Sequence, residues 1–159
     1  MVSMTGDYTI KDVAKVLGID RGRAADWLSR GYIKPSVPST HQGVAARFSR
    51  YDIIMAALFK KLVDRGFDRD DAAEHVMHLV TGHHNIDNVG FAMLCSVPDN
   101  TKKGYSIYSM YVTPGEVPPL LSELTGTKAE SDEDFDYDML IVLDFKTIRK
   151  EVDKRLKEL

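Results

Sequence analysis

Apolar residues recur three and four positions apart in the first third of the chain, a spacing that predicts helices. The first apolar stripe consists of Ile10, Val13, Ala14 and Leu17. Thr9 can cap the start of this helix, with Asp12 completing a capping box, and Gly18 can end it in the left-handed conformation. The inner side of a second helix consists of Ala24, Trp27 and Leu28. Asp20 can cap that helix, and Gly31 can end it.

A stretch with two prolines and a glycine, residues 34–47, separates the second helix from a third. The prolines exclude a helix there, so we expect a short two-stranded wing with its tip near residues 39–43. Ser49 can cap the third helix, which ends at residue 66. Its apolar positions are Ile53, Ile54, Ala57, Leu58 and Leu62. A fourth helix is predicted from residue 68 to about residue 80.

Strand-forming residues dominate the segments 89–96 and 105–112, which flank a polar loop and therefore predict a hairpin. The apolar run 139–145 has the length of a further strand. A short helix started by prolines is expected at 114–124, and an acidic solvated loop at 126–138. The pattern as a whole predicts a mainly α protein with a small α+β C-terminal part. We expect a winged helix-turn-helix, then a short antiparallel or mixed sheet, and finally an amphipathic helix.

Charge divides the chain in the same way. Residues 8–66 hold eleven Lys and Arg against five Asp and Glu, a net charge of about +6, whereas residues 67–159 carry about −8. A basic N-terminal segment followed by an acidic one is typical of a DNA-binding domain attached to a second part that binds a partner. We therefore expect a DNA-binding domain at 1–82 and a small dimerisation or effector module at 83–159.

Several classes of protein receive no support from the sequence. No apolar run approaches a membrane span, and the N-terminus lacks the pattern of a secretion signal, so we expect a cytoplasmic protein with no membrane partner. The single cysteine, Cys95, excludes an internal disulfide. No nucleophile–base pattern, phosphate-binding glycine loop or carboxylate pair is visible. We therefore expect neither an enzyme nor a cofactor.

The chemistry for DNA lies on the outward side of the second helix, which carries Arg21, Arg23, Asp26 and Arg30. Arginine can pair through two hydrogen bonds with guanine or with phosphate. Gly22, near the start of this helix, would let the backbone approach the duplex closely. These residues favour a helix that enters the major groove while the first helix and the wing contact phosphates.

At these residues the chain resembles the mercury-resistance-regulator (MerR) family of bacterial transcription factors over residues 8–66. The order of features is matched by IKDVAKVLGI, DRGRAADWLSRGYI, Pro35 and RFSRYDI. The resemblance implies a transcription regulator with a DNA interface formed by Arg21, Arg23, Asp26, Arg30, Lys34, His41, Gln42, Arg47 and Arg50. Arg47 would contact phosphate beside the wing. Family members usually carry an Arg-Tyr-Tyr run where this chain has Ala25, Asp26 and Trp27, and the wing here is longer.

The C-terminal helix predicted at 146–159 needs a surface on which to bury its apolar stripe. The stripe consists of Ile148, Val152, Leu156 and Leu159. It can pack on the chain's own sheet or on a second copy. We favour a homodimer because a two-fold DNA reader presents two recognition helices. The C-terminal half can also bind a small-molecule or protein effector.

Two further hypotheses concern the histidines and the function. The histidines at positions 75, 78, 83 and 84 could hold a metal, but polar surface positions and helix caps explain them more simply, so we expect no metal site. Besides a transcription regulator, the same fold suits an excisionase-like architectural factor that bends DNA. It also suits a protein-interaction adaptor that keeps the fold without the DNA contacts.

Overall fold

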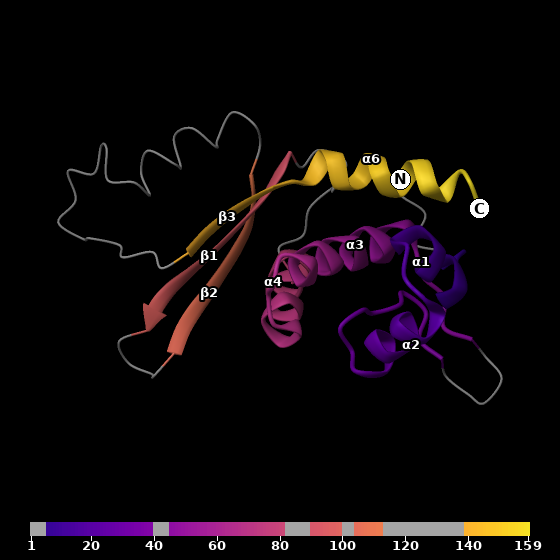
Figure 1. The fold of residues 1–159 in the computed structure, drawn as a ribbon, viewed down its shortest axis with the longest axis horizontal. Helices are drawn as coiled ribbons and strands as arrows, with labels where there is room; N and C mark the ends of the chain where they lie inside the picture. Colours follow the sequence, from indigo (N-terminus) through magenta and orange to yellow (C-terminus); the bar gives the residue numbers. More distant parts are fainter. Residues whose placement is uncertain (1–5, 40–44, 82–89, 100–103, 113–138) are drawn as a thin grey trace. The chain divides into compact units, whose positions relative to one another are not determined.

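The computed structural model describes residues 6–39, 45–81, 90–99, 104–112 and 139–159. The chain forms two compact units (Figure 1). Unit 1 comprises Met1–Val76 together with Thr147–Leu159, and unit 2 comprises Met77–Lys146. Thr147–Leu159 belongs to unit 1 because the C-terminal helix folds back onto the N-terminal helices. The division of function between residues 1–82 and 83–159 stays a prediction.

Unit 1 begins with two helices whose ends follow the local signals in the sequence. Helix α1, Ile10–Leu17, starts with a complete capping box between Thr9 and Asp12 and ends at Gly18, whose φ is 65°. Helix α2, Arg21–Ser29, starts at Asp20, whose carboxylate accepts the backbone N–H of Arg23 at 2.8 Å. The positive φ at Gly18 is the conformation that glycine adopts without steric cost, so the turn between the helices stays tight.

Helix α3, Arg50–Asp64, is the central helix of unit 1. Ser49 and Asp52 form its capping box. The side chains that it buries are Ile53, Ile54, Met55, Ala56, Leu58, Phe59 and Leu62. Phe59 meets the Trp27 ring edge-to-face at 4.9 Å and stacks on Tyr32 at 5.5 Å. These aromatic contacts fix α2 and the residues that follow it against α3.

The base of the wing is a single antiparallel bridge. Val37 and Arg47 exchange backbone hydrogen bonds of 3.1 and 2.8 Å. Next to it, Tyr8 pairs with Phe48 in the same way, so the wing returns directly into the core. The Asp52 carboxylate accepts the backbone N–H and the hydroxyl of Ser36, each at 2.7 Å. The expected wing is therefore present at its base, while its tip at 40–44 lies outside the described residues.

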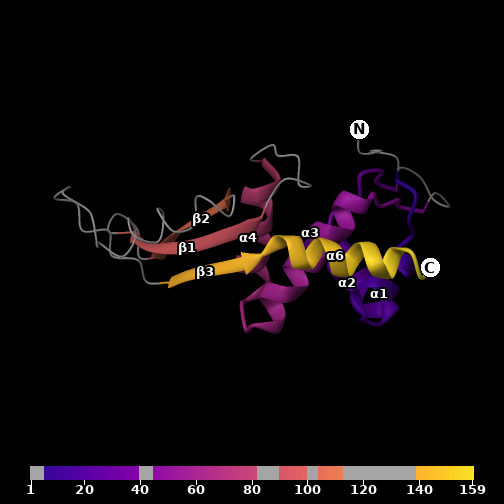
Figure 2. The ribbon, with the colours of Figure 1, turned by 90° about the horizontal axis from the view of Figure 1, so that it is seen from above.

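Helix α6, Phe145–Leu156, follows strand β3 without a linker, and its residues from Thr147 onward belong to unit 1. It lies along α3 on the side away from α2 (Figure 1), and a view turned by 90° places it in front of α1 and α2 (Figure 2). Ile148 and Val152 are buried, Leu156 is half-buried and Leu159 is 45% exposed. The buried part of the predicted apolar stripe is thus covered within the chain itself.

Unit 2 contains a three-stranded antiparallel sheet in the order β2-β1-β3. Its strands are β1, Phe91–Asp99, β2, Gly104–Val112, and β3, Met139–Asp144. In the register, Phe91 lies opposite Val112 on one side and opposite Asp144 on the other. The expected hairpin is confirmed. The third strand ends one residue early because Phe145 already begins α6.

Helix α4, Arg69–Thr81, confirms the fourth predicted helix and crosses the boundary between the units. Within unit 1 it buries Ala72, His75 and Val76. The predicted short helix at 114–124 and the acidic stretch at 126–138 lie outside the described residues. No helix in the described ranges has the length and apolar character that crossing a membrane requires.

Candidate nucleic-acid interface

A binding partner can reach α2 only on its outward side, because α1 and α3 cover its other sides. Its exposed residues are Arg21, Gly22, Ala25, Ser29 and Arg30. Three of these five have small side chains, so the backbone of α2 is accessible to a close partner. Arg21 stands at the first helical position, and the first turn contains no acidic residue. A helix N-terminus carries partial positive charge, so Arg21 adds its own charge to an end that attracts anions.

Arg23, which is predicted to face the groove, lies beside Trp27. Its guanidinium is 4.8 Å from the centre of the Trp27 ring, and the side chain is half-buried. Trp27 itself is completely buried. A guanidinium over an indole face makes a favourable cation–π contact, so Arg23 is held against the body of unit 1. It stabilises the position of α2 in this arrangement.

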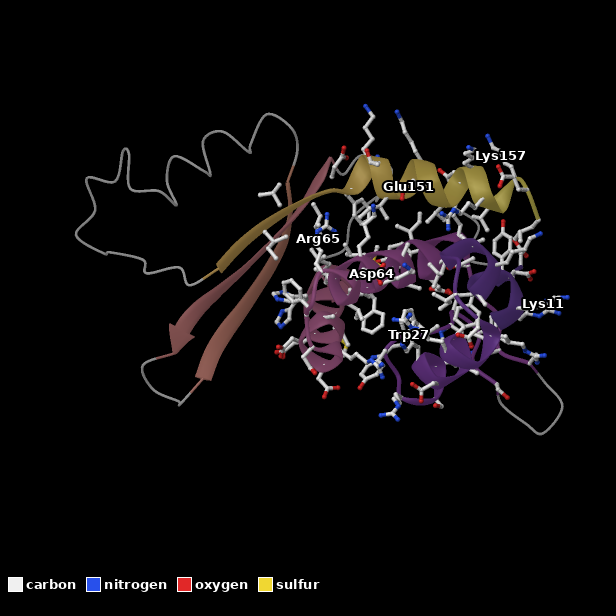
Figure 3. The ribbon with its side chains drawn as sticks, in the orientation of Figure 1. Lys11, Trp27, Asp64, Arg65, Glu151 and Lys157 are labelled. Atoms are coloured by element: carbon white, nitrogen blue, oxygen red, sulfur yellow. The ribbon has the colours of Figure 1, made fainter. Side chains whose placement is uncertain are left out.

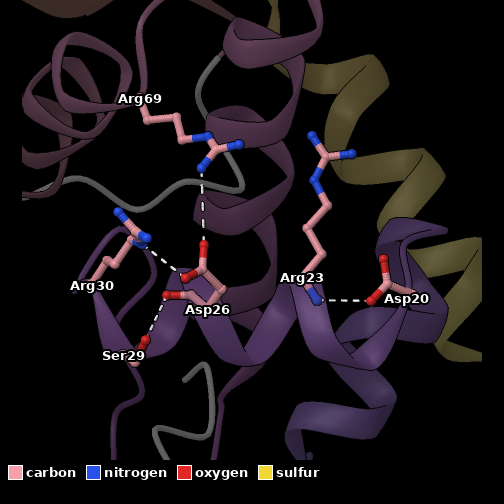
Figure 4. A network of polar contacts seen from close by, with 6 residues as sticks. All are labelled: Asp20, Arg23, Asp26, Ser29, Arg30 and Arg69. Atoms are coloured by element: carbon pink, nitrogen blue, oxygen red, sulfur yellow. Dashed lines mark hydrogen bonds and ion pairs between the residues drawn. The ribbon is translucent and has the colours of Figure 1, made fainter.

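Asp26 organises the C-terminal end of α2 (Figure 4). Its carboxylate accepts the Nε–H of Arg30 at 2.8 Å and lies 3.9 Å from a guanidinium nitrogen of Arg69 in α4. The Ser29 hydroxyl donates to the Asp26 carbonyl oxygen at 2.9 Å. The hydrogen bond from Arg30 to Asp26 raises the pKa of Arg30. Asp26 therefore restrains one expected DNA-contacting arginine and offsets part of its charge.

The wing contributes the remaining cations. Lys34 and Arg47 are exposed on the two sides of the wing base, and the backbone of Arg47 is fixed by its bridge to Val37. His41 and Gln42, both expected on the wing, lie outside the described residues. Within the described ranges, neither Arg21 nor Arg47 forms an ion pair. Both arginines are exposed and therefore accessible to an anionic partner.

Arg50 was expected at the DNA interface, but its guanidinium is engaged by α6. Its Nε donates to Oδ1 of Asp153 at 2.6 Å, and a terminal nitrogen donates to Oδ2 at 2.8 Å. This hydrogen-bonded guanidinium is the main cause of a lowered pKa at Asp153. The sequence contains no local signal for this pair, because the two residues are 103 positions apart.

The histidines are placed only in part. His75 is buried with its ring edge-on to Phe67 at 5.8 Å, whereas His78 is exposed. His83 and His84 lie outside the described residues. No group of three or more His, Cys, Asp or Glu side chains suited to a metal ion occurs in the described part of the chain.

The comparison with protein families gives the site its context. Residues 8–78 match the family model described as MerR HTH family regulatory protein. No curated protein matches the chain. The family match confirms the resemblance predicted for residues 8–66 and extends it into α4. Residues 8–78 thus form a helix-turn-helix domain of the MerR type, the type found in a family of DNA-binding regulators.

Proposed function

We propose that the protein is a sequence-specific transcriptional regulator that inserts α2 into the major groove of double-stranded DNA and sets its wing on the backbone. The observation that carries this proposal is the MerR-type match over α1, α2, the wing base and α3. Helix-turn-helix domains bind in this way because the first helix and the turn hold the second helix at a fixed angle.

Charge supports the assignment of DNA binding to unit 1. This unit contains seventeen Lys and Arg against thirteen Asp and Glu, a net charge of about +4, whereas unit 2 has four against eleven, about −7. Phosphate contacts supply most of the sequence-independent affinity for DNA, so the basic unit is the one that binds the duplex. We assign self-association, and the binding of a small-molecule or protein effector, to the acidic unit 2.

Arg21 and Arg47 are the residues that we assign to direct contact. Arg21 extends from the N-terminus of α2, and Arg47 stands where the wing enters α3. Arg23 and Asp26 act indirectly, because they hold α2 and Arg30 in place. Lys34, His41 and Gln42 complete the wing surface in this proposal. Arg50 contributes to the interface through its bond to α6 and not through a contact of its own with DNA.

A homodimer in the cytoplasm is part of the same proposal. A single recognition helix covers few base pairs, and a two-fold dimer presents two helices about one DNA turn apart. Because Ile148 and Val152 are covered within the chain, we assign the contact between protomers mainly to unit 2. Leu156, half-buried, and Leu159, exposed, can take part at its margin.

One observation favours an architectural factor as the second candidate. Gly22, Ala25 and Ser29 form much of the exposed side of α2, and none of them has a long side chain that can read base edges. A protein with this surface can depend more on phosphate contacts and DNA shape than on base contacts. Selection of bound sequences from random duplexes separates the candidates, since a regulator enriches one motif and an architectural factor enriches none.

The residue assignment is tested by fluorescence anisotropy with a labelled duplex at several salt concentrations. R21A and R47A should each weaken binding, and R47A should do so for all sequences alike and lower the salt slope by about 1. R65A is the matched control, because Arg65 is exposed at the far end of α3 (Figure 3). Wild-type affinity of R21A and R47A, with folding intact, would refute the assignment.

A further inference from the structure

Helix α6 presents a row of lysines on the side that faces away from the other helices of unit 1. Lys150, Lys154 and Lys157 are exposed, whereas Ile148 and Val152 are buried on the opposite side. The lysines are four and three positions apart, the spacing that places side chains on one side of a helix. The backbone N–H of Lys157 still donates to the carbonyl oxygen of Asp153, so the last lysine follows the helical path. We call these three residues the lysine face.

The acidic residues of α6 point elsewhere and are already used. Asp153 binds Arg50, and Glu151 lies 3.4 Å from the ammonium group of Lys61 in α3. In contrast, none of the three lysines forms an ion pair among the residues that the structure describes. Like charges four residues apart destabilise an isolated helix, and an anionic partner removes that cost. Helix α6 thus uses Asp153 and Glu151 for docking. The three lysines stay outside, and beside Lys157 stands the exposed Glu158, whose backbone carbonyl accepts a hydrogen bond from Lys15.

The position of the lysine face is fixed by the docking of α6. Arg155 donates to the carbonyl oxygen of Val16 at 2.7 Å, and Lys15 donates to that of Glu158 at 3.3 Å. With the pairs to α3, these contacts hold α6 on the opposite side of α3 from α2 (Figure 1). Lys157 projects away from the core of unit 1 (Figure 3). The lysine face and the outward side of α2 are therefore on opposite sides of one unit.

The dimensions and chemistry of this face fit a phosphate backbone. From Lys150 to Lys157 the chain rises about 10 Å along the axis of α6. Over the same distance along the axis of a DNA duplex, one strand presents about three phosphates. A basic row along one side of a helix is the electrostatic footprint of nucleic-acid binding. A membrane surface is a poorer partner, since helices that lie in bilayers insert an apolar side, and the apolar side of α6 is packed within the chain.

We propose that the lysine face is a second binding surface for the phosphate backbone of double-stranded DNA, so that one molecule holds two duplexes on opposite sides of unit 1. The second surface stands on the α6 geometry alone, whereas the bridging of two duplexes also rests on the proposed contact at α2. Binding at the lysine face is independent of sequence, because lysine on phosphate carries no base information.

The test uses the full-length protein and the triple variant K150Q/K154Q/K157Q, with K150R/K154R/K157R as the charge-preserving control. An immobilised duplex captures a second, fluorescent duplex only when the protein bridges the two. The glutamine variant should lose this capture and lower the salt slope of total DNA binding by about 3. The arginine variant should retain both properties. Circular dichroism melting should show all three proteins equally folded, since the substituted side chains are exposed.

Each other outcome has a definite meaning. Undiminished capture by the glutamine variant overturns the proposal, and it assigns bridging to a dimer that uses two copies of α2. Loss of binding to phosphatidylserine vesicles without a change in DNA binding also overturns it, in favour of a membrane. In a third outcome, R21A/R47A binds a single duplex as wild type does, while the glutamine variant loses salt-dependent affinity. This result refutes the proposed DNA contact at α2 and supports DNA binding by the lysine face.

Discussion

Arg50 and Asp153 form a two-point ion pair that joins the start of α3 to the C-terminal helix. The distances are 2.6 Å and 2.8 Å, and about a third of each side chain remains exposed. Two parallel N–H···O bonds to a carboxylate are stronger and more directional than a single contact between surface charges. The pair connects the last helix of the chain to the element that follows the wing. Docking of α6 and the geometry of the proposed DNA interface are therefore physically linked.

Replacing Asp153 should weaken this docking. D153N removes the charge and one acceptor, so it should lower the free energy of unfolding by about 1–2 kcal/mol, after allowance for partial exposure. E151Q is the matched control, because Glu151 and Lys61 form a longer and more exposed pair and its loss should cost about 0–1 kcal/mol. Urea unfolding followed by circular dichroism measures both values. If both substitutions lower the free energy of unfolding equally, the Arg50–Asp153 pair stabilises the fold no more than the Lys61–Glu151 pair does.

Acid should weaken unit 1 through two carboxylates. The Arg50 hydrogen bond lowers the pKa of Asp153, and the backbone hydrogen bond at Thr9 lowers the pKa of Asp12, each from 3.8. A carboxyl with a lowered folded-state pKa stabilises the fold fully above its unfolded value, and this contribution disappears as the pH falls through the folded value. The free energy of unfolding should therefore fall below about pH 4. D153N should make this fall shallower, and an unchanged pH dependence would contradict the assignment.

Local signals in the sequence predicted most of unit 1. The pairs Thr9–Asp12 and Ser49–Asp52 are three residues apart and form the capping boxes that the spacing predicted. Gly18 takes the left-handed conformation that ends α1. Such features depend on a few neighbouring residues, so a single sequence contains all the information that they need.

The environments of the expected site residues could not be predicted in the same way. The family resemblance implies a DNA contact for Arg50, and its partner Asp153 becomes visible only when α6 packs on α3. Arg23 is predicted to face the groove, and its cation–π contact with the buried ring of Trp27 becomes visible only in the folded chain. In contrast, the spacing of Asp26 and Arg30 is itself a local signal for an ion pair. Contacts distant in sequence decide which arginines remain accessible.

Trp27 should prove structural. The side chain is completely buried and contacts Phe59, so W27A removes a large core group and should lower the free energy of unfolding by about 3–5 kcal/mol. W27F is the graded control, since the indole N–H has no hydrogen-bond partner among the described residues and its loss should cost less than loss of the ring. Chemical denaturation measures both. An alanine variant with wild-type stability but no DNA binding would instead make Trp27 a contact residue.

The C-terminal apolar stripe can pack within the chain or between two copies, and the two arrangements predict different effects of a substitution at Val152 on stability and on oligomeric state. Val152 is 4% exposed within a single chain, whereas Leu159 is 45% exposed. An aspartate at position 152 places a charge against the core, so V152D should lower the free energy of unfolding by about 3 kcal/mol or more, whatever the protein concentration.

Leu159→Asp is the control for the same stripe and should change stability by no more than about 0.5 kcal/mol. Thermal melting at several protein concentrations, combined with light scattering, measures stability and oligomeric state together. If V152D melts as wild type does and changes only from dimer to monomer, the stripe is a seam between copies. If V152D instead melts early at every concentration, the stripe is part of unit 1, and self-association depends on other surfaces of the chain.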